Sequence, residues 1–179
     1  MRKLTHEEIV TRQLEKLKEL RLLFTVVLNN IRSLYNVGSI FRTADGAGVE
    51  KIWLCGITGY PPNNQISKTA LGAEERVPWE YRCDIISVVE ELKAKGYQLV
   101  LLEQIEHSIL YQDFIPQSPV CLIIGNEIEG ISQKLILCCD QAIEIEMAGV
   151  KNSLNVSVAF GVVAYHIRQC LNKKGAAHG

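Results

Sequence analysis

The first segment whose residues could do chemistry follows an apolar run and opens a predicted helix at Asn36. Asn36 is a good N-cap residue, and Gly38 keeps the first turn of that helix open. Free N–H groups at a helix N-terminus favour anions, and Arg32 and Arg42 flank this terminus. The two arginines could therefore hold a phosphodiester between them. A capped helix with a surface arginine is the alternative interpretation.

The second segment, residues 124–130, reads I-G-N-E-I-E-G and follows an apolar run. Its glycines, Gly125 and Gly130, let the backbone turn sharply and approach a ligand closely. Glu127 lies just beyond the predicted strand end. The spacing matches neither the dinucleotide fingerprint nor the P-loop, which argues against nicotinamide or nucleoside triphosphate chemistry. An ordinary strand-to-helix turn is again the alternative.

The third segment, residues 145–155, places small and polar residues where a strand gives way to a helix. Ser153 could cap that helix, in which case its hydroxyl has a structural role. The helix that follows is rich in small and β-branched residues, which favours tight packing against other backbone. His107 and His166 are weaker candidates, because His107 lies in a loop and His166 deep inside the last helix.

The elements that must position these segments alternate between strand and helix. Runs of buried-strand type are predicted at residues 22–28, 52–55, 97–102, 120–124 and 142–145, and helices at 37–47, 85–95, 133–138 and 154–171. This order predicts an α/β fold with a mainly parallel sheet and helices on both faces. Ligands of such sheets bind beyond the carboxyl ends of the strands, where the three segments lie.

The N-terminal residues read as a separate helix. Thr5 and Glu8 have the spacing of a capping box, and an apolar stripe follows it, so this helix is expected to pack on the body or on a partner chain. Pro61 and Pro62 precede two asparagines and predict a loop. The chain is thus divided into a helical extension, residues 1–22, and one domain, residues 23–179.

Composition excludes several classes of protein. No apolar run is long enough to span a bilayer and no secretory signal is evident, so the chain is expected in the cytoplasm. The six cysteines form no C-x-x-C pair and are expected to be buried free thiols, with no metal site. The net charge of −1 argues against a strongly basic nucleic-acid binder, yet both ends of the chain are basic and could contact phosphates.

Together and in this order, the three segments resemble the SpoU (TrmH-type) branch of the SPOUT RNA methyltransferases. The matching residues are N-I-R-S-x-x-N-V-G-S-I-F-R-T-A-D at 30–45, I-G-N-E-I-E-G at 124–130 and I-E-M-A-G-x-x-x-S-L-N-V-S-V-A at 145–159. The resemblance covers roughly residues 23–171. Each segment alone is only suggestive, but three in order are highly specific.

The resemblance implies a C-terminal deep trefoil knot, a homodimer with its active site at the dimer interface, and S-adenosylmethionine as cofactor. The cofactor would be bound largely through backbone groups. The matching positions in this sequence are Leu102, Gly125, Ile145, Ser153 and Leu154.

The implied reaction is attack of an RNA ribose 2'-hydroxyl on the methyl group of the cofactor. The family pattern puts the catalytic arginine at Arg42, either as the base or as a group that orients phosphate or stabilises negative charge. Asn36 and Asn155 would position the ribose or support Arg42. Glu127 would hold the loops, and Ser153 would contact the target hydroxyl or the cofactor. The implied contacts with RNA are made by Arg32, Arg42 and Lys151.

Transfer RNA is the favoured substrate, because compact members of the family often act on it, and ribosomal RNA is the alternative. A non-catalytic RNA-binding protein with the same fold is a second alternative. A base methyltransferase of the same superfamily and a metabolic enzyme that binds a nucleotide cofactor are also compatible with the fold.

Overall fold

A seven-stranded sheet is the centre of the fold, and every strand pair in it is parallel. The computed structural model describes residues 2–17, 23–126 and 131–176. In sheet order, the strands are β3 (Trp79–Arg82), β2 (Lys51–Cys55), β1 (Phe24–Asn29), β6 (Val120–Ile124), β4 (Gln98–Leu102), β7 (Gln141–Glu144) and β5 (Ile109–Leu110). The mainly parallel α/β sheet is confirmed; its threading into a knot stays a prediction.

The two central strands explain why the sequence shows continuous apolar runs. All residues of β1 and β6 are buried, because helices cover both faces of the sheet. The two strands are in register, with Val26 opposite Leu122 and Leu28 opposite Ile124. Their carboxyl ends therefore lie side by side, next to that of β4, where Leu102 is opposite Ile124.

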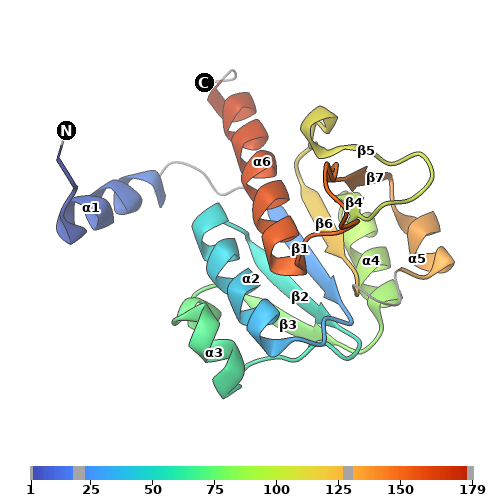
Figure 1. Cartoon of the computed structure of the whole chain (residues 1–179), viewed down its shortest axis with the longest axis horizontal. Coiled ribbons are helices and arrows are strands. Elements are labelled where there is room, and N and C mark those ends of the chain that lie inside the picture. Colours follow the sequence, from blue (N-terminus) through green and yellow to red (C-terminus); the bar gives the residue numbers. More distant parts are fainter. Residues whose placement is uncertain (1, 18–22, 127–130, 177–179) are drawn as a thin grey trace.

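Helices cover the sheet on both faces (Figure 1). Helices α2, α3 and α6 pack on one face, and α4 and α5 pack on the other. In chain order the helices are α1 (His6–Leu17), α2 (Leu34–Ala47), α3 (Asn64–Ala70), α4 (Ile85–Ala94), α5 (Gln133–Cys138) and α6 (Val156–Ala176), with short 3₁₀ turns η1 (Ala73–Glu75) and η2 (Tyr111–Asp113).

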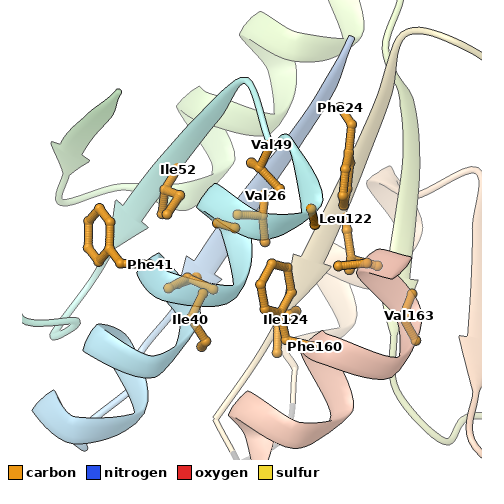
Figure 2. Packing of buried hydrophobic residues seen from close by; sticks show 14 of the residues in the cluster. Phe24, Val26, Ile40, Phe41, Val49, Ile52, Leu122, Ile124, Phe160 and Val163 are labelled. Carbon is orange, nitrogen blue, oxygen red and sulfur yellow. The ribbon is translucent and has the colours of Figure 1, made fainter. Parts of the chain in front are cut away.

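The larger part of the core lies between the sheet and the helices α2 and α6 (Figure 2). Phe41 of α2 and Phe160 of α6 are fully buried there with Leu122 of β6. This burial fixes α2 and α6 against the carboxyl half of the central strands. Both helices begin at this edge of the sheet, so the loops that precede them lie over it.

Two predicted helix caps are wrong. Helix α2 begins at Leu34 and is capped by Ser33, whose Oγ accepts a hydrogen bond from the backbone N–H of Asn36 at 3.3 Å. Helix α6 begins at Val156, and Asn155 rather than Ser153 accepts from the backbone N–H of Ser157, at 2.9 Å. The side chains of Asn36 and Ser153 are therefore not used as caps.

The predicted loop is confirmed at residues 61–63, and helix α3, which the sequence did not predict, follows it directly from Asn64. The side chain of Asn63 accepts from the backbone N–H of Gln65 at 2.9 Å and starts this seven-residue helix. Helix α3 packs on α2 at Gly38, where a Cβ atom would lie 2.2 Å from the carbonyl oxygen of Ile66. Gly38 therefore allows a close helix contact; it does not open the first turn of α2.

The N-terminal helix α1 stands apart from the sheet and its covering helices (Figure 1). Its predicted capping box is confirmed, because the backbone N–H of Thr5 donates to Glu8 at 2.8 Å and that of Glu8 donates to the Thr5 hydroxyl at 3.3 Å. The expected packing of this helix on the body is not seen.

The cysteines differ strongly in exposure. The expectation of buried thiols is wrong for Cys83, which is exposed, whereas Cys55 and Cys121 are buried. Burial raises the pKa of Cys55 to about 12 and holds the pKa of Cys121 well above its usual range. Since the thiolate is the reactive form, the buried thiols are poorly reactive at neutral pH.

A thiol reagent is therefore expected to modify Cys83 well before Cys55 and Cys121. Absorbance of the released chromophore at pH 8 should show a fast phase that Cys83→Ser removes. Unfolding in urea should make all six cysteines of the chain reactive. A fast phase of unchanged amplitude in Cys83→Ser would contradict the assignment.

Candidate active site

A cavity of about 320 Å³ lies at the carboxyl edge of β4, β6 and β7. Leu102 ends β4, Gly125 follows β6 and Ile145 follows β7, so the three strand ends converge on it. This is where parallel α/β sheets bind ligands. Its lining residues are Leu102, Glu103, Gln104, Ile124, Gly125, Asn126, Glu144, Ile145, Met147, Asn152, Ser153, Leu154, Val156 and Ala159.

One side of this cavity is formed by the loop between β7 and α6. The Gln104 side chain, which follows β4, donates to the carbonyl oxygen of Asn152 at 3.0 Å and ties the loop to the strand edge. All five positions predicted for cofactor binding line the cavity. The lining combines apolar side chains with polar and charged ones, so it offers both apolar contacts and hydrogen-bonding groups to a small organic cofactor.

A second cavity, of about 100 Å³, adjoins the first. The two share Asn126 and Val156 as lining residues. The smaller cavity is otherwise lined by the loop between β1 and α2, with Asn30, Ile31, Arg32, Ser33 and Asn36. A ligand in one cavity would therefore lie next to a ligand in the other.

Asn36 and Asn155, 119 positions apart in the sequence, are joined by a hydrogen bond. The Asn155 Nδ2 atom donates to Asn36 Oδ1 at 3.1 Å. Asn155 Oδ1 accepts from the backbone N–H and from the hydroxyl of Ser157, at 2.9 and 2.7 Å. The start of α6 therefore fixes Asn155, Asn155 fixes Asn36, and the Asn36 amide nitrogen can donate to an oxygen of a ligand.

The loop between β1 and α2 is held by the loop that follows β2. Asn30, which has a positive φ of 59°, accepts at Oδ1 from the backbone N–H of Ile57 at 3.0 Å. The backbone N–H of Ile31 donates to Thr58 Oγ1 at 3.0 Å, and the same hydroxyl donates to the carbonyl oxygen of Leu28. Three bonds thus fix the wall that carries Arg32.

The structure does not bring every predicted site residue together within one chain. Arg42 is exposed on α2 and does not line either cavity. Lys151 is exposed in the loop before α6 and also lies outside both linings. Glu127 lies outside the described residues.

The profile of the SpoU rRNA Methylase family matches residues 23–165. This match spans most of the chain and includes all three segments. The chain belongs to the SpoU family. The three segments that carry the family pattern are also the segments that form the two adjoining cavities.

Relatives of the SpoU family agree with this assignment. A protein of Staphylococcus haemolyticus assigned to the TrmH family of tRNA/rRNA methyltransferases is 32% identical over 142 residues, which cover 79% of this chain and 57% of that protein. A tRNA (guanosine(18)-2'-O)-methyltransferase of Aquifex aeolicus is 29% identical over 150 residues, 84% of this chain and 71% of the relative. The chain spans less than two thirds of the length of the Staphylococcus relative.

Solved structures show the same fold. The A. aeolicus TrmH/SpoU tRNA modifying enzyme has a TM-score of 0.79 at 26% identity, covering 93% of this chain and 86% of that one. An AdoMet-bound rRNA methyltransferase from Sinorhizobium meliloti has a TM-score of 0.77 at 28% identity, covering 82% and 56%.

Sequence reasoning missed Asn126, which is buried and lines both cavities. Its place between Gly125 and Glu127 in the second segment is the signal that could have identified it.

Among the described residues, no helix is long and apolar enough to cross a membrane. The same residues contain no group of three or more His, Cys, Asp or Glu side chains that could hold a metal ion.

Proposed function

We propose that this chain transfers a methyl group from S-adenosylmethionine to a ribose 2'-hydroxyl in RNA, with transfer RNA as the favoured substrate. The observation that carries the proposal is the pair of adjoining cavities, which share Asn126 and Val156 and join the three segments of the family pattern. A methyl donor and its acceptor must lie in contact, so their binding sites must be neighbours, and these two cavities are adjacent.

The larger cavity suits S-adenosylmethionine. Its apolar lining residues can enclose an adenine ring, and among the described residues of its lining the charged ones are Glu103 and Glu144 and none is basic. Such a lining favours a cofactor that carries a sulfonium and an ammonium group. Bound there, the cofactor supplies an electrophilic methyl group. We assign its binding to Leu102, Gly125, Ile145, Ser153 and Leu154, largely through backbone groups.

The smaller cavity is assigned to the target nucleotide. The Asn36 amide, held by Asn155, would donate to a ribose oxygen, and Arg32 would contact the neighbouring phosphate. Ser153 would contact the target hydroxyl or the cofactor, and Lys151 a phosphate farther along the RNA. We keep Glu127 as the residue that holds the motif loops together.

A 2'-hydroxyl is a weak nucleophile, so the reaction needs a group that removes its proton or stabilises negative charge on its oxygen. We assign this role to Arg42. Because Arg42 lies outside both cavities of its own chain, it would reach a ribose from a second copy. We therefore propose a homodimer in which Arg42 of one protomer completes the site of the other.

The exposed side of α6 supports such a dimer. Val158 and Tyr165 remain 52% and 51% exposed there, and large apolar side chains that are exposed together favour an interface. Helix α6 packs directly on α2, where Arg168 donates a hydrogen bond to the carbonyl oxygen of Gly46. An interface on these helices would place Arg42 near the partner protomer.

The choice of RNA rests on the relatives. The A. aeolicus relative acts on tRNA and the S. meliloti protein is an rRNA methyltransferase, so both RNA classes must be tested. A catalytically inactive RNA-binding protein is the second candidate.

We also propose a cytoplasmic location and a division between residues 1–22 and the catalytic domain, residues 23–179.

The purified protein is expected to transfer labelled methyl groups from S-adenosylmethionine to RNA. Total tRNA, ribosomal RNA and unmodified transcripts should be assayed separately, and nuclease digestion should release 2'-O-methylnucleosides. Calorimetry should detect cofactor binding without RNA.

The possible failures of this experiment have different meanings. Absence of transfer to all three RNA preparations would reject the enzymatic function, and RNA binding without cofactor binding would favour the inactive RNA-binding protein. Methyl groups found on bases would assign a base methyltransferase instead.

A further inference from the structure

Three aromatic side chains gather at the β3 edge of the sheet. The Tyr60 ring is stacked on Trp79, with centroids 6.2 Å apart and planes inclined by 26°. Its centroid also lies 4.7 Å from that of Tyr81. Tyr60 nevertheless remains 48% exposed. We call the exposed Tyr60 ring, with Trp79 and Tyr81 behind it, the Tyr60 platform.

The position of the platform is fixed by its surroundings. The Tyr81 hydroxyl donates to the carbonyl oxygen of Gly56 at 2.8 Å, which ties β3 to the loop that carries Tyr60. The same loop lies tightly on α2, because a Cβ atom at Gly59 would be 2.2 Å from Leu34 Cδ2. An aromatic side chain that is already held in place loses little conformational entropy when a ligand binds to it.

The loop of the platform also holds a wall of the smaller cavity. Ile57 and Thr58 of this loop form the hydrogen bonds to Asn30 and Ile31, both at 3.0 Å. Asn30 and Ile31 line the cavity assigned to the target ribose. The loop that carries Tyr60 is therefore hydrogen-bonded to two residues that line that cavity.

We propose that the Tyr60 platform stacks an unpaired RNA base close to the methylated nucleotide. The proposal rests on the proposed function, because it extends the same site. Every base offers a flat face to an aromatic ring, and unpaired bases in RNA loops are commonly bound this way. Arg32, which is exposed and lines the cavity, would contact a phosphate that connects the two nucleotides. The platform would thus select nucleotides in loops over those in duplexes.

The test compares Tyr60→Ala, Tyr60→Leu and Tyr60→Phe. Loss of one stacked base should raise the KM for RNA and the Kd of a short unpaired RNA by about 5- to 100-fold in Tyr60→Ala. Tyr60→Phe should retain wild-type values. Tyr60→Leu should resemble Tyr60→Ala, because it covers Trp79 and Tyr81 without offering an aromatic face. The Kd for S-adenosylmethionine should be unchanged in all three variants.

Leu137→Ala is the matched control, because Leu137 is 74% exposed on α5, on the opposite face of the sheet. Thermal unfolding separates a folding defect in Tyr60→Ala from a binding defect, and Tyr60→Leu repeats the test with the apolar cover retained. A wild-type KM and Kd in Tyr60→Ala, or RNA binding by Tyr60→Leu equal to that of Tyr60→Phe, would overturn the proposal that the platform stacks a base.

The outcome for the platform can be distinguished from that for the proposed function. If the wild-type protein binds RNA without methylating it and Tyr60→Ala weakens this binding, the platform stands and the enzymatic function fails. If methylation is observed and Tyr60→Ala leaves both KM and Kd unchanged, only the platform fails. If the wild-type protein does not bind RNA, both are rejected.

Discussion

Replacing Arg42 by alanine is expected to slow methyl transfer by about 100- to 1,000-fold, the size of effect seen when a group that stabilises transition-state charge is removed. Arg42 is exposed on α2, so its loss should leave the fold intact. Single-turnover rates at saturating RNA and cofactor report the chemical step directly. Arg42→Lys should restore little of the rate, because lysine lacks the planar guanidinium that can form two hydrogen bonds at once.

The control for Arg42→Ala is Arg76→Ala, because Arg76 is also exposed and lies outside both cavities. The Kd for S-adenosylmethionine should be unchanged in both variants. A rate for Arg42→Ala within twofold of wild type would remove Arg42 from the proposed mechanism.

Mixing two inactive variants tests whether Arg42 acts across the dimer. A heterodimer of Arg42→Ala and Asn36→Ala chains contains one intact site only if Arg42 and Asn36 of the same site come from different protomers. Random mixing should then restore about a quarter of wild-type activity, because half of the dimers are mixed and one of their two sites is intact. No recovery in verified heterodimers would place both residues in one protomer's site.

Strands are predicted well from the sequence where burial on both faces of the sheet requires a continuous apolar run. The central strands β1 and β6 are buried along their whole length, and their apolar runs could be recognised directly. The strand ends then place the three polar segments at one edge, and the cavity lining contains all five expected cofactor positions. Parallel pairing brings these segments together from distant parts of the chain.

Elements without such a pattern could not be predicted. Strand β3 lies at the sheet edge and none of its residues is buried, and β5 has two residues. The cap of α2 was misassigned because Ser33 and Asn36 are both favourable N-cap residues three positions apart. Packing decides between them, since Leu34 contacts the core and belongs to the first turn of the helix. The exposure of Arg42 on its own chain likewise depends on tertiary structure.

Gly38→Ala is expected to lower the free energy of unfolding by about 2–3 kcal/mol, because the added methyl group overpacks the contact between α2 and α3. In an exposed helix the same change would stabilise by about 1 kcal/mol, so the packing effect must exceed the helix propensity. The new Cβ atom would lie 2.1 Å from Thr69 Oγ1 and 2.2 Å from the carbonyl oxygen of Ile66. A side chain can rotate away, but a helix carbonyl moves only with its helix.

Urea unfolding of Gly38→Ala and of Gly149→Ala provides the measurement, since a Cβ at Gly149 meets no atom within 4 Å. Gly149→Ala should change stability by less than about 0.5 kcal/mol. Gly38→Ala/Thr69→Ala should recover only part of the loss, because the Ile66 carbonyl remains in place. A Gly38→Ala protein as stable as wild type would show that α3 can move away from α2 freely. Gly38 is only two residues after Asn36 on α2. Cofactor affinity and methyl transfer should therefore be measured on the same variant, to learn whether α3 also positions the Asn36–Asn155 pair.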